Sequence, residues 1–398
     1  MRIIITLYLL ALCISCSESN NENNNDLYSN ITLLNTASNI TINSIKIDTV
    51  KTNINFTYSG DTFWKHRDDT LYLFDRLLGI VDIFNCKGEF YKRALGIGKG
   101  PNEVMEEIGT VCNFNNGWLI VDIYNVFRFS RSFDNKRHKF LFSIDQDMQK
   151  KKQDLRNNPN PAKDIELYVP AYITPQMTFL NNKSVIMKIS CEYPDFREKK
   201  YYTESAIVAE YSFNKGTITK LMGKYPPCYK TENYTTAFAN HYYSKYNKNN
   251  YLLNFGIDSL IYICDNSFNP KKAFGLSGKM KNINYDTKDS DNKTNHYNFK
   301  NERIIRGYYT SIYYCKEKDL TFRIYKTGIK KENIPVDLSE VTNPSRMQIY
   351  KGTNLIGDVS IPEHFEIIGY NDSWFFADGY FNTKEDYDIV GFYKFKIE

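Results

Sequence analysis

One hydrophobic pattern recurs along most of the chain: a short apolar strand, a turn, a second strand ending near Asp or Asn, and a turn carrying Gly or Lys. Its clearest copy runs from Thr70 to Ala94, where LYLFD is followed by GIVDIF, the turn NCKG and the segment EFYKRA. Apolar residues at alternate positions between tight turns predict neighbouring antiparallel strands. Further copies occupy 117–142, 184–191 with 206–223, 250–275, 308–326 and 347–398.

Repeats of this kind predict an all-β fold, a β-propeller, because one blade cannot bury its own faces and must pack against its neighbours. About 360 residues divided by six gives roughly 60 per unit, so seven ordinary blades also fit the length. Polar insertions at 145–163 and 279–298 absorb the excess as loops or a short exposed helix, and six blades over 39–398 become the expected count. A β-sandwich or a pair of β domains is the alternative, since any β protein alternates strands and turns.

Both ends of this region are rich in β-forming residues. The early segment is ITINSIKIDTV, 40–50, and the late one runs from Asp388 to Glu398. We expect the early strand to complete the last blade beside the C-terminal strand, which would close the ring and protect a sheet edge.

The first residues have the pattern of a targeting segment. Arg2 supplies positive charge, and the apolar run from Ile3 to Ile14 is too short to span a bilayer. The run ends in Ser15-Cys16, and a lipoprotein signal peptidase requires a small residue directly before the cysteine that becomes acylated. We therefore expect a lipoprotein signal peptide over 1–15 and an acylated Cys16, with an ordinary cleaved signal and a soluble product as the alternative.

The residues after Cys16 predict how the domain is attached. SESNNENNND is polar and rich in Asn, so 16–38 is expected to be a lipidated flexible tether between membrane and propeller. The anchor predicts an outer-membrane lipoprotein. Glu18 is a single acid close behind the anchor, and it leaves the periplasmic and the surface-exposed face both open.

Composition agrees with β structure and limits the partners. The chain has 32 Tyr and 26 Phe, and its 51 basic and 46 acidic residues are interspersed. A net charge of +5 spread in this way forms no basic face, so nucleic acid is not an expected partner.

The cysteines after the anchor stand singly, with no C-x-x-C pair and no neighbouring His. This spacing gives no support for a metal site or a redox centre, and we expect no cofactor. Most of these thiols are expected to be packing residues, although an exported protein can form disulfides and the pairing stays open. They are Cys86, Cys112, Cys191, Cys228, Cys264 and Cys315.

The segment ALGIGKGPNEV, 94–104, resembles the G-x-G-P-x-E segment of the six-bladed propeller lipoproteins that are widespread in Bacteroidetes. FGIDSLIYICD, 255–265, and KYPPCY, 224–229, resemble other recurring elements of the same proteins. The resemblance implies a TolB-like or NHL-like propeller and no established activity. The residues that match the first motif are Gly98, Gly100, Pro101 and Glu103.

In physical terms this motif predicts a turn. Glycines reach positive φ and allow close approach of another backbone, proline stiffens the exit, and Glu103 can accept bonds from amides of its own loop. A loop that presents amides and Glu103 to a ligand is the alternative. The spacing is not that of a phosphate-binding loop.

A tyrosine-rich segment between Tyr225 and Tyr251 carries the expected binding site. Aromatic rings beside amide and hydroxyl groups suit stacking on sugars or contact with a peptide, so the expected ligand is a glycan or a partner protein. Packing of these rings between blades is the alternative. The candidate ligand-binding residues are Tyr234, Tyr242, Tyr243 and Tyr246.

Catalysis is the second hypothesis. The five His residues lie far apart, and no nucleophile motif is present, but a propeller can gather residues from distant blades at its central channel for a metal-assisted hydrolase or lyase. Acids near strand ends are the available cluster, and capping of turns is their more frequent role. These acids are Asp75, Asp122, Asp258, Asp265, Asp372 and Asp378.

Overall fold

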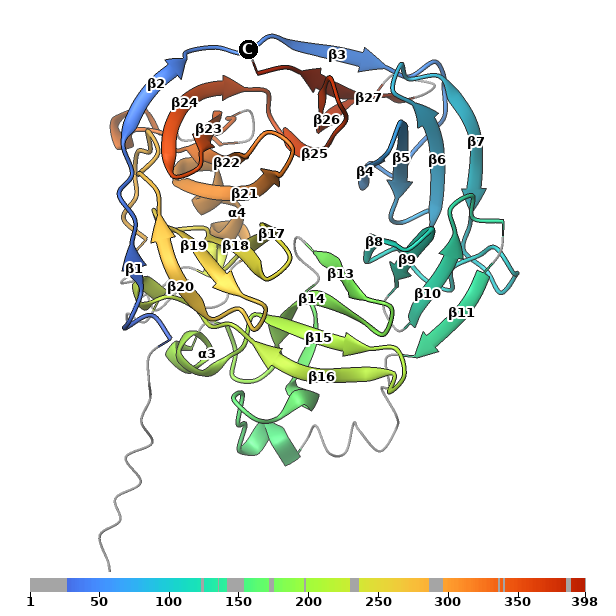
Figure 1. Cartoon of the computed structure of the whole chain (residues 1–398), viewed down its shortest axis with the longest axis horizontal. Helices are drawn as coiled ribbons and strands as arrows, with labels where there is room; N and C mark the ends of the chain where they lie inside the picture. The colour runs from blue at the N-terminus through green and yellow to red at the C-terminus, as the bar shows by residue number, and fades with distance from the viewer. Residues whose placement is uncertain are drawn as a thin grey trace, which may run out of the picture.

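The computed structural model describes residues 27–397, apart from 123–124, 135, 142–153, 172–174, 197, 230–235, 286–295, 336, 339–340 and 384–387. Within this part of the chain the strands form six sheets arranged around a common centre (Figure 1). The fold is a six-bladed β-propeller, so the count of six is confirmed over the count of seven. No helix in the described part is long and apolar enough to cross a membrane.

Each blade is built on an antiparallel meander of four strands, with the first strand nearest the centre (Figure 1). Blade 1 contains β4 (Thr62–Arg67), β5 (Thr70–Asp75), β6 (Ile80–Asn85) and β7 (Phe90–Leu95). Blade 2 contains β8 (Thr110–Phe114), β9 (Gly117–Val121), β10 (Asn125–Ser130) and β11 (Lys136–Leu141). Blade 3 contains β13 (Met177–Asn181), β14 (Ser184–Cys191), β15 (Val208–Ser212) and β16 (Thr217–Met222), and β12 (Tyr168–Pro170) pairs with the far end of β14.

The second half of the ring repeats this plan. Blade 4 contains β17 (His241–Lys245), β18 (Asn250–Phe255), β19 (Ile261–Asp265) and β20 (Pro270–Phe274). Blade 5 contains β21 (Gly307–Cys315), β22 (Leu320–Thr327), β23 (Ser345–Lys351) and β24 (Asn354–Ile361). Blade 6 contains β25 (Glu366–Tyr370), β26 (Phe375–Thr383) and β27 (Asp388–Phe395). The predicted sixth repeat, 347–398, therefore begins too early, because 347–361 supplies the outer strands of blade 5.

The N-terminal segment runs along the outer rim of three blades (Figure 1). β1 (Thr32–Leu33) pairs with β20 and β2 (Ser38–Ile42) pairs with β24, both in parallel. β3 (Ile47–Lys51) then pairs antiparallel with β27 and becomes the fourth strand of blade 6. This confirms the expected closure by an early strand beside the C-terminal strand.

Residues 27–38 fall within the range that the sequence analysis assigned to the tether, and they pack against the propeller. The Tyr28 ring meets the ring of Tyr262 edge-on at 5.1 Å, and its hydroxyl donates to the carbonyl of Lys224 at 2.6 Å. The physical reason is that this stretch regains apolar residues, including Leu27 and Ile31, which pack against the core of blades 3 and 4.

Helices are few in the described residues. The α-helices include α3 (Lys199–Glu204) and α4 (His296–Ile305), and α4 begins inside the second polar insertion. Short 3₁₀ turns are η1 (Ile165–Leu167), η2 (Pro227–Tyr229), η3 (Thr236–Phe238) and η5 (Lys331–Asn333).

The cysteines of the described residues are free thiols. Cys112, Cys191, Cys264 and Cys315 are buried, whereas Cys86 and Cys228 are half-buried. Small apolar side chains in this environment fill the core between strands. The prediction that most of the thiols are packing residues is confirmed.

Candidate functional site

A pocket of about 540 Å³ lies where α4 meets the inner strands of blades 4, 5 and 6. In Figure 1, α4 is seen beside β21 near the centre of the ring. Three blades and one helix therefore converge on one pocket, at the place where a propeller gathers side chains from distant parts of its sequence. Its aromatic and charged groups are those of Tyr242, Lys300, Arg303, Tyr308, Lys326, Glu363, His364 and Glu366.

A β-bulge shapes the wall that blade 5 contributes. Tyr309 pairs with Tyr325 and Ser311 pairs with Ile324, so Thr310 is an extra residue in β21. Bulges turn neighbouring side chains away from strict alternation and are frequent beside functional sites. Thr310 and Ser311 both line the pocket as a result.

Asn343 fixes the end of α4 over this wall. Its amide nitrogen donates to the carbonyls of Arg303 at 3.0 Å and Arg306 at 2.7 Å. Its amide oxygen accepts the N–H of Gly328 at 2.8 Å, directly after β22. The last carbonyls of a helix have no partner within the helix, and here a buried amide supplies one. Arg303 is thereby held over the pocket.

Tyr242 connects the pocket to a buried lysine. Lys188 lies on β14 in blade 3 and is 4% exposed, and its ammonium is 5.1 Å from the centre of the Tyr242 ring on the inner strand of blade 4. A cation over an aromatic face is attracted by the ring electrons. Lys188 therefore reaches across a blade interface to the ring of a residue that lines the pocket.

The surroundings of Lys188 lower its pKa. Burial and, to a smaller extent, the positive charge of Arg303 lower the pKa of the Lys188 ammonium to about 7, although Glu366 acts in the opposite direction. Lys326 is paired with Glu363, with nitrogen and oxygen 3.8 Å apart. A buried lysine with a lowered pKa next to a pocket residue is a candidate functional group.

The structure separates the four candidate tyrosines. Tyr242 lines the pocket. Tyr243 points to the opposite side of β17, where it is 1% exposed and its backbone N–H donates to Gln176 at 3.2 Å. The Tyr246 ring packs against Tyr314 with ring centres 4.6 Å apart. Tyr234 and Cys16, the predicted lipidation residue, lie outside the described residues.

The Gly98 to Glu103 loop forms a tight turn between blades 1 and 2. The carboxylate of Glu103 accepts the N–H of Gly100 at 2.6 Å, as expected for a loop that satisfies its own amides. A Cβ atom on Gly98 would lie 2.1 Å from that carboxylate, so a larger residue there would displace the Glu103 side chain from its bond to Gly100. Pro101 between them is exposed.

The acids proposed for catalysis have mainly local roles. In four of the six, the carboxylate accepts a backbone N–H two or three residues further along the chain; these are Asp75, Asp122, Asp258 and Asp265. Asp378 accepts the N–H of Trp64 at 2.9 Å, and burial raises its pKa to about 6. Asp372 is exposed. Within the described ranges, no group of three or more His, Cys, Asp or Glu side chains is arranged to hold a metal ion.

Sequence reasoning missed Lys188 and Arg303. A lysine inside the apolar run SVIMKISC is a signal that could have indicated a buried cation. Arg303 offers no comparable signal, because it follows a polar insertion and its role depends on how α4 folds back over blade 5.

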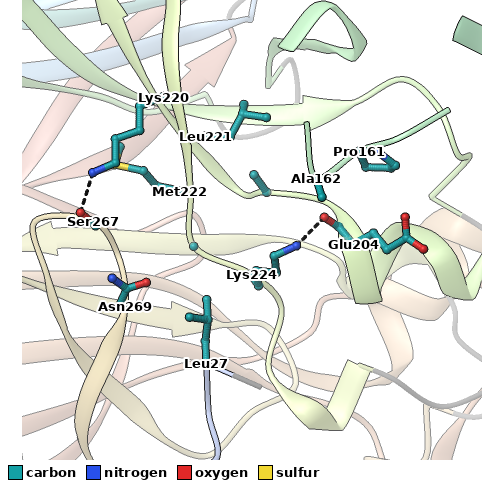
Figure 2. A pocket seen from close by; sticks show the side chains of 12 residues that line it. Leu27, Pro161, Ala162, Glu204, Lys220, Leu221, Met222, Lys224, Ser267 and Asn269 are labelled. Carbon is teal, nitrogen blue, oxygen red and sulfur yellow. Dashed lines mark hydrogen bonds between the residues drawn. The ribbon is translucent and has the colours of Figure 1, made fainter. Parts of the chain in front are cut away.

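A second pocket, of about 330 Å³, lies on the outer rim between blades 3 and 4. Figure 2 shows its polar groups, where Lys220 donates to Ser267 at 2.6 Å and Lys224 donates to the carbonyl of Glu204 at 2.7 Å. Both ammonium groups thus already have acceptors on the protein. The walls of this rim pocket come from two blades and the N-terminal segment, whereas three blades and α4 line the other pocket.

Comparisons with known proteins identify relatives in fold. No family model matches the chain, and no curated protein matches it. A crystal structure of a DUF4221 family member from Bacteroides vulgatus is similar with a TM-score of 0.59 and 13% identity, over 89% of this chain and 99% of that one. A protein from Bacteroides fragilis described as exported is similar with a TM-score of 0.50 and 14% identity, over 92% of this chain and 100% of that one. At such identities the likeness establishes the propeller fold alone.

Proposed function

We propose that the protein is an envelope-anchored binding protein that takes a glycan into the pocket beside α4. The observation that carries this proposal is the pocket itself, in which hydroxyl, aromatic and charged side chains from three blades and α4 meet. Concave sites with a few convergent polar groups are the usual form of small-ligand sites. A partner protein was the other expected ligand, but a recessed pocket suits a sugar better than a broad protein surface.

Attachment to the envelope rests on the N-terminal sequence. The export signal and Cys16 supply an anchor, and the description of the Bacteroides fragilis neighbour as exported agrees with such a location. The alternative of a metal-assisted hydrolase or lyase has no comparable support among the described residues, whose acids mostly cap turns.

Affinity electrophoresis in gels containing soluble neutral or acidic polysaccharides tests the binding site. We expect at least one polysaccharide to retard the native protein and Tyr242→Ala to reduce that retardation, because the ring is part of the pocket wall. Tyr91→Ala is the matched control, since Tyr91 is 62% exposed on blade 1. Equal retardation of Tyr242→Ala and the native protein would remove the pocket from the binding site.

Labelling with a fatty-acid analogue tests the anchor separately. The native protein is expected to carry the label and Cys16→Ala to lack it, because acylation requires the thiol of Cys16. Label retained by Cys16→Ala would contradict lipidation at this residue and would leave the glycan site unaffected.

A further inference from the structure

We propose that the N-terminal segment 27–42 is a clamp that holds blades 4, 5 and 6 at the spacing that forms the pocket beside α4. Docking of this clamp and binding of a ligand in the pocket then strengthen each other. The inference rests on the proposed function, because it concerns the regulation of the same pocket. It does not depend on acylation of Cys16.

The clamp and the pocket involve the same three blades. β1 pairs with the outer strand of blade 4, β2 pairs with the outer strand of blade 5, and β3 continues the chain into blade 6 (Figure 1). The inner strands of these blades and the turns beside them line the pocket, for example through Tyr242, Thr310 and Glu366. Because hydrogen bonds join the strands of each blade into one sheet, a segment that fixes three outer strands also constrains the wall at the centre.

Two apolar clusters connect the clamp to the pocket. Leu34 packs against a cluster between blades 4 and 5 that includes the pocket residue Tyr242. Ile42 packs against a second cluster, between blades 5 and 6, that includes Ile324 and Phe365 of the pocket wall. Protein cores are close-packed, so a change at one end of such a cluster is transmitted to the side chains in contact with it. Both interfaces thus connect the rim to the pocket.

The clamp can leave the rim while every blade keeps its meander. Both residues of β1 and four of the five residues of β2 are exposed, and the two strands add to edges of sheets that are otherwise complete. Tyr28 is the buried attachment of the segment, with 9% of its surface exposed. Backbone bonds hold the remainder, from Leu34 to the carbonyl of Ala273 at 2.8 Å and from Leu355 to the carbonyl of Ala37 at 2.9 Å. Docked and released states of the segment can therefore exchange while β3 keeps the ring closed.

Amide hydrogen exchange of the full-length protein in detergent tests the link without a ligand. Tyr28→Ala removes the buried attachment, so the amides of Leu34 and Leu355 should exchange at least about tenfold faster. The amide of Gly328, which donates to the pocket residue Asn343 at 2.8 Å, should also exchange faster. Tyr28→Phe keeps the ring and should have a smaller effect at all three amides.

Val111→Ala is the matched control for these measurements. It removes buried volume from blade 2, in a cluster that contains no residue of the clamp or of the pocket wall. Exchange at Leu34 and Gly328 should therefore stay as in the native protein.

Affinity electrophoresis of the same variants tests the link with a ligand. The probe is whichever of a soluble β-glucan, a galactomannan and polygalacturonate retards the native protein most. We expect Tyr28→Ala to lower the affinity for this polysaccharide by about fivefold or more, and Val111→Ala to leave it unchanged. Because coupling is reciprocal, a saturating amount of the polysaccharide should slow exchange at the Leu34 amide of the native protein by a similar factor.

The outcomes separate the clamp from the proposed function. Faster exchange at Leu34 with unchanged exchange at Gly328 would overturn the clamp and leave 27–42 as a cover for two sheet edges. Affinity that is lost in Tyr242→Ala but retained in Tyr28→Ala would also overturn the clamp and would keep the glycan site. If no polysaccharide retards the native protein, the glycan site is wrong, and exchange at Gly328 in Tyr28→Ala still decides whether the clamp acts on the pocket.

Discussion

Two buried cations lie on either side of blade 4, and their surroundings differ. Arg323, on the second strand of blade 5, is 0% exposed and donates to the amide oxygen of Asn254 and the carbonyl of Ser259, both at 2.6 Å, with further bonds to the carbonyls of Asp258 and Leu260. Its guanidinium also lies over the ring of Tyr309, 3.2 Å from the centre.

Lys188 occupies the corresponding second strand of blade 3, and its surroundings as a whole oppose its charge. Both cations face a tyrosine ring, but Lys188 lies 5.1 Å from the ring of Tyr242. A buried charge with a full set of acceptors joins two blades, whereas strongly shifted pKa values are frequent at functional sites. The comparison indicates that partner groups, as well as burial, decide how strongly a buried cation holds its proton.

The largest expected effect comes from Arg323→Met. The variant leaves the acceptors of blade 4 without a donor in a buried interface, which should lower the free energy of unfolding by about 3–5 kcal/mol. Urea unfolding followed by circular dichroism measures the loss. Lys188→Met is the matched control and should lower stability by less than about 1 kcal/mol at neutral pH. Similar losses for both variants would mean that the two cations are equally structural.

The next effect is the pH dependence of Lys188. Between its folded pKa of about 7 and its ordinary value of 10.5, the unfolded chain binds more protons than the folded one, so stability contributed by this site rises with pH. The free energy of unfolding of the native protein should therefore rise, relative to that of Lys188→Met, by up to about 1.4 kcal/mol per pH unit above pH 7. Urea unfolding of both proteins from about pH 6 to about pH 9 measures the difference between their free energies of unfolding. The contributions of the other titratable groups are the same in both proteins and cancel in this difference. A constant difference across this range would show that Lys188 stays charged.

The sequence predicted the fold better than the site, for a physical reason. Strand alternation and turns are local, so the repeats indicated six blades, and the closure by β3 followed from β-forming residues at both ends. The boundary between blades 5 and 6 was missed because strands of both have the same pattern. The partners of Arg303 and Lys188 lie on other blades and on α4, and no local pattern specifies such contacts.

The two tyrosine rings that face Arg323 and Lys188 should differ less in their contribution to stability than the two cations do. Tyr309→Leu removes a ring directly under a desolvated guanidinium and a hydroxyl that accepts a bond, and it should lower the free energy of unfolding by roughly 2–3 kcal/mol. Tyr242→Leu removes a more distant ring at the pocket wall and should lower it by about 1 kcal/mol. Chemical denaturation of both variants makes the comparison. A larger loss for Tyr242→Leu would reverse the assignment of the structural cation.

The smallest effect should come from Tyr309→Phe, which keeps the ring and removes only the hydroxyl. That hydroxyl accepts the N–H of Gly278 at 3.0 Å, so its loss should lower the free energy of unfolding by about 1 kcal/mol. Faster hydrogen exchange at the Gly278 amide would locate the change. If Tyr309→Phe were as unstable as Tyr309→Leu, the hydroxyl would account for the whole effect of Tyr309. The ring would then add nothing to the four acceptors around Arg323, and those acceptors alone would distinguish it from Lys188.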